Sequence, residues 1–255
     1  MRFYDPATTP PERLDSLELF PHLSEEEGAI KCLRMGLLPS VTNILGTFRE
    51  EYLERHMIRE GIKHFEKHRN VDFALDAVYG SSPNSDFGTD CHDIVELKLL
   101  GKPIPKDGTI NPVALKHCKP LLAWIDKNVK EVIHAEVVLA SQTLGTAGTV
   151  DMVFVTHANQ YVVGDLKVVK FSDKYPPKPG LAYRCQLSAY AEMLRETYDK
   201  TFQRWSFYLA SPFGWNNRPD IRVFRHKESH LETFKAAKLI WENKLLMERV
   251  KGELA

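Results

Sequence analysis

The fold is decided by Gly148-Thr-Val-Asp-Met-Val-Phe-Val155 and by Tyr161-Val-Val-Gly-Asp-Leu-Lys-Val-Val169, which follows after a short gap. Both stretches are rich in valine and carry aromatic residues, a composition that favours β-strands. The residues between them, His157-Ala-Asn-Gln160, suit a hairpin connection. We therefore predict an antiparallel pair of strands in this part of the chain.

Two acids and a lysine interrupt these apolar strands. Side chains alternate between the two faces of a strand, so Asp165 and Lys167 share one face and Leu166 points to the other. Asp151 can face them from the neighbouring strand. A carboxylate pair beside a lysine is a recurrent arrangement for binding Mg²⁺ and activating a water molecule, so we expect the chemistry of the protein here.

The plainer interpretation of Asp165 and Lys167 is a surface ion pair on an edge strand. Valine residues flank the pair on both sides, at 162–163 and 168–169, which is typical of a central strand buried on both faces. An unpaired carboxylate in such a strand would be costly without a metal ion. We therefore favour a functional site over an ion pair.

Upstream of the hairpin, the sequence predicts one more strand and a helix. The strand covers Glu131–Ser141, and Gly145 and Gly148 suit the turn that joins it to the hairpin. A helix is predicted over residues 112–129, where Pro120 should kink or divide it.

A second helix is predicted over residues 87–100, with Thr89 or Asp90 as its N-cap. Further upstream we expect an extended arm or short strands over residues 1–38, a short apolar segment over 38–45 and a helix over 48–68.

Downstream of the hairpin, a proline-rich loop at 172–180 leads into a helix over about residues 181–197. Strands around 202–210 and 220–226 follow, on either side of a turn at 211–217. The last helix opens with the capping box Ser229-His-Leu-Glu232. Its predicted apolar stripe consists of Leu231, Phe234, Ile240 and Leu246.

This order of elements predicts an α/β protein with a mixed central sheet flanked by helices and an N-terminal helical elaboration. We expect residues 1–85 to form the N-terminal arm and elaboration and residues 86–255 to form the core. The two parts should make one compact unit.

Composition limits the class of protein. The chain has 255 residues, of which 43% are apolar, and its 34 basic residues equal its 34 acidic ones. A contact with a polyanion must therefore use a local basic patch. The four cysteines form no CxxC pair, which argues against a zinc knuckle or a disulfide framework. No apolar run is long enough for a membrane helix and no signal or transit peptide is evident, so we expect a cytoplasmic protein without membrane contact.

Several motifs together resemble a known family. Gly148-Thr-Val-Asp151, Gly164-Asp-Leu-Lys167 and Gln186-Leu-Ser-Ala-Tyr190 are similar, in this order, to motifs of the PD-(D/E)xK nuclease superfamily. The match is to its RecB-like exonuclease branch of phage and bacterial type. Phe87-Gly-Thr-Asp-Cys-His-Asp-Ile-Val-Glu96 resembles the helical histidine motif of that branch, and Leu38–Leu45 resembles openings seen in its members. The resemblance implies a restriction-endonuclease-like core.

The resemblance also implies roles for the motif residues. Asp151, Asp165, the main-chain carbonyl of Leu166 and His92 would bind Mg²⁺ or Mn²⁺. Lys167 would position or deprotonate the attacking water and help to neutralise the charge of the transition state. Cleavage would be hydrolysis of a phosphodiester bond by metal-activated water.

Other residues have more than one interpretation. A lone helical histidine such as His92 is more often structural than a ligand. Glu96 either reaches the metal or contacts the sheet, and Glu136 could ligate metal, bond the turn or position a ligand. Gln186 and Tyr190 lie four apart on one helix face, where they would contact the DNA backbone, hold the lysine or fill the core.

The loop after the catalytic strand is either a proline-rich connector or a DNA-binding segment. Its Lys174 and Lys178 could contact phosphates, and Tyr175 could stack on a base. With these lysines a local basic cluster would form, composed of Lys167, Lys170, Lys174, Lys178 and Arg184.

The function expected from the resemblance is that of a metal-dependent deoxyribonuclease, acting as an exonuclease on single-stranded or duplex ends in DNA repair or recombination. A recombination or replication protein is an expected partner. We expect no ATP motor, because no GxxxxGK[ST] motif is present. We expect no iron–sulfur cluster, because only Cys185 lies near the relevant helix. The alternatives are a non-catalytic nucleic-acid-binding module of the same fold and a structure-specific or flap endonuclease.

Overall fold

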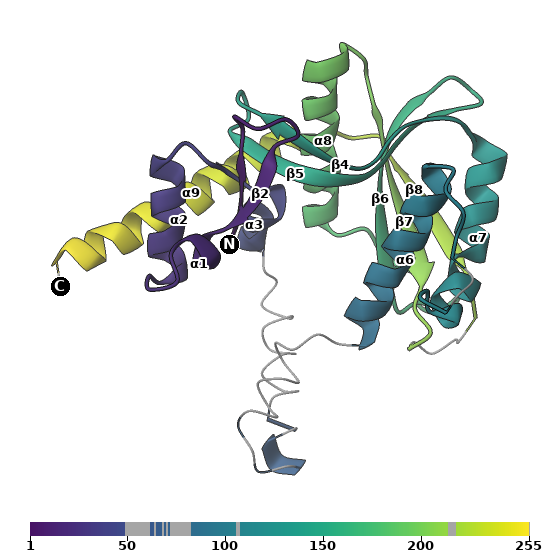
Figure 1. Ribbon diagram of the computed structural model, residues 1–255, viewed down its shortest axis with the longest axis horizontal. Coiled ribbons are helices and arrows are strands. Elements are labelled where there is room, and N and C mark those ends of the chain that lie inside the picture. The colour runs from purple at the N-terminus through teal and green to yellow at the C-terminus, as the bar shows by residue number, and fades with distance from the viewer. Residues whose placement is uncertain are drawn as a thin grey trace.

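The computed structural model describes most of the chain (Figure 1). The described residues are 1–48, 62–63, 65–67, 69, 71, 83–105, 108–213 and 218–254. The helix predicted over 48–68 therefore falls mostly outside them.

A five-stranded mixed sheet forms the centre of the molecule, with the strand order β4-β5-β6-β7-β8. Neighbouring strands are antiparallel except β6 and β7, which run parallel and are joined by a helix. The strands are β4 Val129–Ser141, β5 Thr146–Thr156, β6 Tyr161–Val169, β7 Gln203–Ala210 and β8 Ile221–His226. The predicted α/β class, the predicted strands and the central position of the acid-bearing strand are confirmed.

The β5–β6 hairpin has the predicted connection. The N–H of Thr156 donates to the carbonyl of Gln160 at 3.0 Å, and Asn159 takes the left-handed conformation, with φ 57°. Gly145 lies in the β4–β5 turn with φ +60°, as expected. Gly148 lies inside β5 and not in that turn, which corrects the prediction.

Two layers of helices cover the sheet. Helices α6 Pro83–Leu99 and α7 Pro112–Asn128 pack on one face, and α8 Leu181–Tyr198 packs on the other. The alternation of β5 divides its side chains between these layers: Met152 belongs to the α6–α7 core, and Val153 to the α8 core.

The helix α6 begins earlier than predicted, because Pro83 is favourable in a first helical turn. The prediction of Thr89 or Asp90 as its N-cap is wrong, since both lie inside the helix and the Thr89 hydroxyl donates to the carbonyl of Ser85 at 3.4 Å. In α7, Pro120 does not divide the helix.

The N-terminal segment contains a small sheet in the order β2-β1-β3, in agreement with the expected short strands. It also contains α2, a ten-residue helix that the sequence analysis missed, although Ser24 and Glu27 form a complete capping box at its start. The elements are β1 Arg2–Asp5, β2 Glu12–Asp15, α1 Ser16–Leu19, α2 Glu25–Arg34, β3 Leu38–Pro39, α3 Val41–Leu45 and the 3₁₀ turn η1 Gly46–Phe48.

The last helix, α9 Leu231–Leu254, buries a different face from the predicted stripe. Leu231 and Phe234 contact the core, but Ile240 and Leu246 are 50% and 54% exposed. The buried residues are Phe234, Ala237, Trp241 and Leu245. The predicted capping box does not form, because the Ser229 hydroxyl accepts from the N–H of Leu231 instead of Glu232, and the Glu232 carboxylate pairs with Lys235. Within the described part of the chain, no helix is long and apolar enough to cross a membrane.

Candidate metal centre and active site

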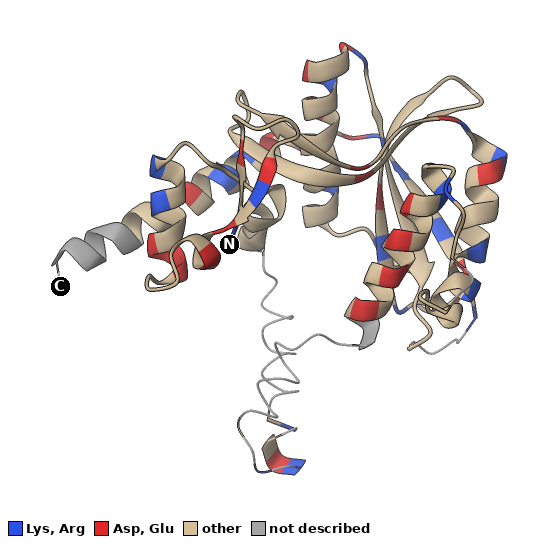
Figure 2. Cartoon of the chain, viewed as in Figure 1, with Lys and Arg blue, Asp and Glu red and all other residues tan. Residues whose placement is uncertain are grey.

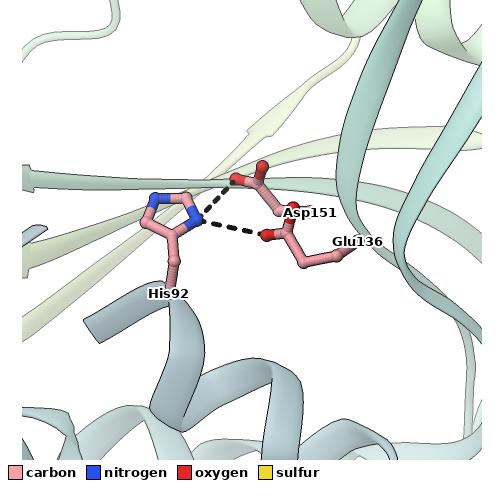
Figure 3. Close-up of side chains that lie close together, drawn as sticks. All are labelled: His92, Glu136 and Asp151. Carbon is pink, nitrogen blue, oxygen red and sulfur yellow. Dashed lines mark hydrogen bonds and ion pairs between the residues drawn. The ribbon is translucent and has the colours of Figure 1, made fainter. Parts of the chain in front are cut away.

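Three elements bring together a histidine and two acids. His92 comes from α6, Glu136 from β4 and Asp151 from β5, and their ligand atoms all lie within 4.8 Å of one another (Figure 3). The Nδ1 atom of His92 lies 3.3 Å from a carboxylate oxygen of Glu136 and 3.8 Å from one of Asp151. This group could hold a metal ion.

The backbone at Glu136 is unusual. Its φ is 46°, a left-handed conformation that costs a non-glycine residue about 1–3 kcal/mol. The β4–β5 register also shifts between Val132 and His134, just before this residue. In this conformation the Glu136 carboxylate faces His92 and Asp151 (Figure 3). Strain of this kind clusters at functional sites, and here it places an acid beside the other two groups.

The site lies where β5 and β6 part. The last paired residues of the two strands are Met152 and Gly164, and beyond them β4 and β5 curve away from β6 (Figure 1). A side-chain hydrogen bond links the two strands at this point: a carboxylate oxygen of Asp151 on β5 accepts from the N–H of Leu166 on β6 at 2.6 Å. Near this point His92 of α6 lies close to the carboxylates of Asp151 on β5 and Glu136 on β4.

Asp165 and Lys167 form an ion pair next to this group. The ammonium of Lys167 lies 2.8 Å from Oδ1 of Asp165. Asp165 is 2% exposed, and its other oxygen, Oδ2, has no hydrogen-bond partner among the described residues. A buried carboxylate oxygen without a donor calls for a cation or a water molecule.

The site perturbs the pKa values of its own groups. Burial by itself would lower the pKa of His92, but the hydrogen bond with Glu136 and the charge of Asp151 outweigh it and raise that pKa to about 8. Burial raises the pKa of Asp165 to about 6 against the opposing charge of Lys167. Burial works to lower the pKa of Lys167, but the charges of Asp165 and Asp151 raise it. Lys167 is therefore a cation at neutral pH.

An open cavity of about 580 Å³ gives access to the site. One wall is α6, which carries Asp93 and Glu96, and Figure 2 shows acidic residues along this helix. The other walls come from β4 and β6. The lining residues are Ser85, Gly88, Thr89, His92, Asp93, Glu96, Glu136, Leu166, Lys167 and Val168.

The remaining predicted residues lie at different depths. Glu96 lines the cavity but is not part of the group around His92. Gln186 and Tyr190 are buried, and the Gln186 amide donates to the Tyr190 hydroxyl at 3.4 Å. Lys174 and Lys178 are exposed, and the Arg184 guanidinium donates to the carbonyl of Pro179 at 3.0 Å.

The residues fit a divalent cation. Carboxylates and one imidazole are donors that Mg²⁺ and Mn²⁺ accept, and the unpartnered oxygen of Asp165 adds another donor nearby. Glu136, which sequence reasoning left with three interpretations, is one of the three grouped residues. Its unusual backbone gives no signal in the sequence.

Comparisons with known proteins found similarity only among solved structures. No family model and no curated protein matches the sequence. A protein from Eubacterium rectale named "Putative exonuclease" is similar at 13% identity over 72% of this chain and 75% of its own, with a TM-score of 0.42. The structure of SSO0001 is similar at 14% identity over 91% of this chain and 82% of its own, with a TM-score of 0.38. Similarity at this level carries no argument about function.

Proposed function

We propose that this protein is a Mg²⁺- or Mn²⁺-dependent deoxyribonuclease of the PD-(D/E)xK superfamily, RecB-like exonuclease branch, which acts on DNA ends. The observation that carries the proposal is the convergence of His92, Glu136 and Asp151 beside the Asp165–Lys167 pair. His92, Asp151, Asp165 and Lys167 belong to motifs of the resemblance, and Glu136 lies on the neighbouring strand β4. The five residues come from four separate elements. A chance ion pair between Asp165 and Lys167 would not explain why His92, Glu136 and Asp151 lie beside it.

In this proposal His92, Glu136, Asp151 and Asp165 hold the cation, together with the main-chain carbonyl of Leu166. When bound, a divalent cation would supply Lewis-acid polarisation of a phosphodiester and of a water molecule. The N–H of Leu166 fixes the carboxylate of Asp151, and Lys167 fixes one oxygen of Asp165, which leaves Oδ2 for the cation.

The protonated Lys167 supplies positive charge at the point where the phosphate becomes more negative during hydrolysis. It is 22% exposed, and it lines the open cavity that reaches the site. Its ammonium can therefore hold an attacking water or a phosphate oxygen without leaving Asp165.

The DNA would approach from the side opposite α6. Asp93 and Glu96 give the α6 wall of the cavity a negative charge, which disfavours phosphates. The exposed Lys174 and Lys178, in the loop after β6, would contact the backbone of the DNA. The helix α8 would hold this side of the site in place through Arg184, Gln186 and Tyr190.

The test is cleavage of an end-labelled DNA duplex with Mg²⁺, Mn²⁺ or EDTA. Asp165→Asn and Lys167→Ala should each lower the rate at least about a thousandfold, because each removes a group of the reacting centre. Lys200→Ala is the control, since this exposed lysine lies outside the predicted basic cluster. Near-normal cleavage by either site variant, in protein free of contaminating nuclease, would refute the proposal.

The form of the products separates the alternatives. An exonuclease should shorten linear DNA labelled at the 5′ or 3′ end and leave circular DNA intact. Cleavage of circles or of flaps at an internal site would indicate an endonuclease. Binding without metal-dependent shortening would indicate a non-catalytic module.

A further inference from the structure

The ammonium of Lys167 has a second neighbour that the motifs did not include. It lies over the ring of Tyr183, 5.1 Å from the ring centroid, while Asp165 holds it at 2.8 Å. A cation within about 6 Å of an aromatic centroid is attracted by the negative face of the ring. The ammonium is thus held by a carboxylate and by an aromatic face.

Tyr183 is itself fixed in place. It lies in the first turn of α8, after the proline-rich loop, and its ring packs edge-on against Tyr208 with centroids 6.4 Å apart. Tyr208 packs in the same manner on Phe224 at 5.5 Å. It is also the residue of β7 that pairs with Lys167 in the parallel ladder. Tyr208 of β7, backed by Phe224 of β8, therefore holds the ring of Tyr183 beside Lys167.

We propose that Tyr183 is a positioning residue for the reaction: its ring orients the Lys167 ammonium for the reacting phosphate. This inference rests on the proposed nuclease function. A lysine ends in a compact charge on a flexible four-carbon chain with many rotamers. The carboxylate of Asp165 alone limits where the charge lies, and the ring removes further orientations. Catalysis gains because the ammonium need not reorganise when the transition state forms.

Two substitutions separate the ring from the hydroxyl. Tyr183→Leu removes the aromatic face but keeps an apolar side chain against Tyr208, and it should lower kcat by about 3- to 30-fold, the range that cation–π energies correspond to. KM should change by less than about twofold. Tyr183→Phe keeps the ring and should restore kcat to near the wild-type value.

A stacking contact with DNA or a purely structural role would give other results. Loss of base stacking would raise KM with kcat unchanged. A general loss of packing would lower the urea midpoint of Tyr183→Leu together with its kcat, and this result would also overturn the inference. An unchanged kcat in Tyr183→Leu would overturn the inference, as would an equal loss in Tyr183→Phe.

A second experiment needs no catalysis. In metal-free protein labelled with ¹³Cε-lysine, the ring current of Tyr183 should shift the Lys167 methylene signal upfield; the signal is assigned by its absence in Lys167→Ala. The shift should persist in Tyr183→Phe and disappear in Tyr183→Leu. The same Lys167 shift in wild type and Tyr183→Leu would overturn the inference. If Lys167→Ala retains cleavage, the nuclease proposal fails, whatever this signal shows.

Discussion

At the scale of single residues, Glu136 is the candidate metal ligand with the most unusual backbone. It has a left-handed conformation and lies beside His92 and Asp151, in a group that could hold a metal ion. Glu136→Gln should weaken Mn²⁺ binding at least about tenfold, because even supporting residues of metal sites contribute that much. Isothermal titration measures this affinity.

Glu96 offers a matched control for this experiment. It lines the same cavity and carries the same charge, but it lies outside the group around His92. Glu96→Gln should therefore change the Mn²⁺ affinity less than Glu136→Gln. Equal losses in the two variants would mean that the cation binds further along α6.

His226 predicts a pH dependence of stability. Burial, with the charges of Arg184 and Arg204, lowers its pKa to about 4, and its Nε2 lies 2.8 Å from the hydroxyl of Ser206. An unfolded histidine titrates near about 6.5, so between these values the unfolded chain binds the proton and the folded chain does not. The contribution of His226 to the free energy of unfolding should therefore fall as the pH falls from about 6.5 to 4.

The comparison variant is His226→Gln, which retains a polar side chain and cannot titrate. Urea unfolding of the metal-free protein at several pH values should show a smaller fall for this variant between pH 7 and 5. Asp165 and His92 have raised pKa values and work in the opposite direction, but they are present in both proteins. Parallel curves for the two proteins would contradict the prediction.

At the scale of elements, the packing of α8 on β5 depends on a glycine. A Cβ atom at Gly148 would lie 2.8 Å from the hydroxyl oxygen and 2.9 Å from a ring carbon of Tyr190. Tyr190 is buried, so its ring has little room to move. Gly148→Ala should destabilise the protein by about 1–3 kcal/mol, as overpacking does.

Gly88 provides the control, since it lies inside α6 and a Cβ atom there would meet nothing within 4 Å. Gly88→Ala should be neutral or stabilise by up to about 1 kcal/mol, because alanine favours helix. Urea unfolding measures both variants. A stability of Gly148→Ala equal to wild type would show that Tyr190 moves freely.

At the scale of the whole molecule, the N-terminal segment shares its core with the C-terminal helices. Phe3 is fully buried and lies 6.5 Å from the ring of Trp241, and Cys32 and Ile44 belong to the same core as Leu187 of α8. We propose that residues 1–85 and 86–255 fold as one unit, because neither part can bury this surface alone.

Phe3→Ala tests this proposal. It should lower the free energy of unfolding of the whole protein by about 3–5 kcal/mol within a single transition. Met35→Ala is the control, since Met35 is 62% exposed. The measurement is urea unfolding followed by tryptophan fluorescence and by circular dichroism. A main transition that Phe3→Ala leaves unchanged would show that the arm is a separate appendage.

The sequence alone determined the strands and the part of the site that lies on one hairpin. Runs of valine specify strands locally, and the alternation of a strand forces Asp165 and Lys167 onto the same face. Periodicity also indicated the helices around His92 and Gln186. These predictions succeeded because they depend on neighbours only a few residues away.

Only the tertiary structure decided which distant groups meet. His92 of α6 meets Glu136 and Asp151 from two strands, and the Glu136 carboxylate faces them from a left-handed backbone. The ammonium of Lys167 lies over the ring of Tyr183. The buried face of α9 was predicted wrongly for the same reason, since that face packs on α8, on α3 and on the ring of Phe3, more than two hundred residues earlier in the chain. Local propensity fixes the period of an element, but burial against a partner fixes its orientation.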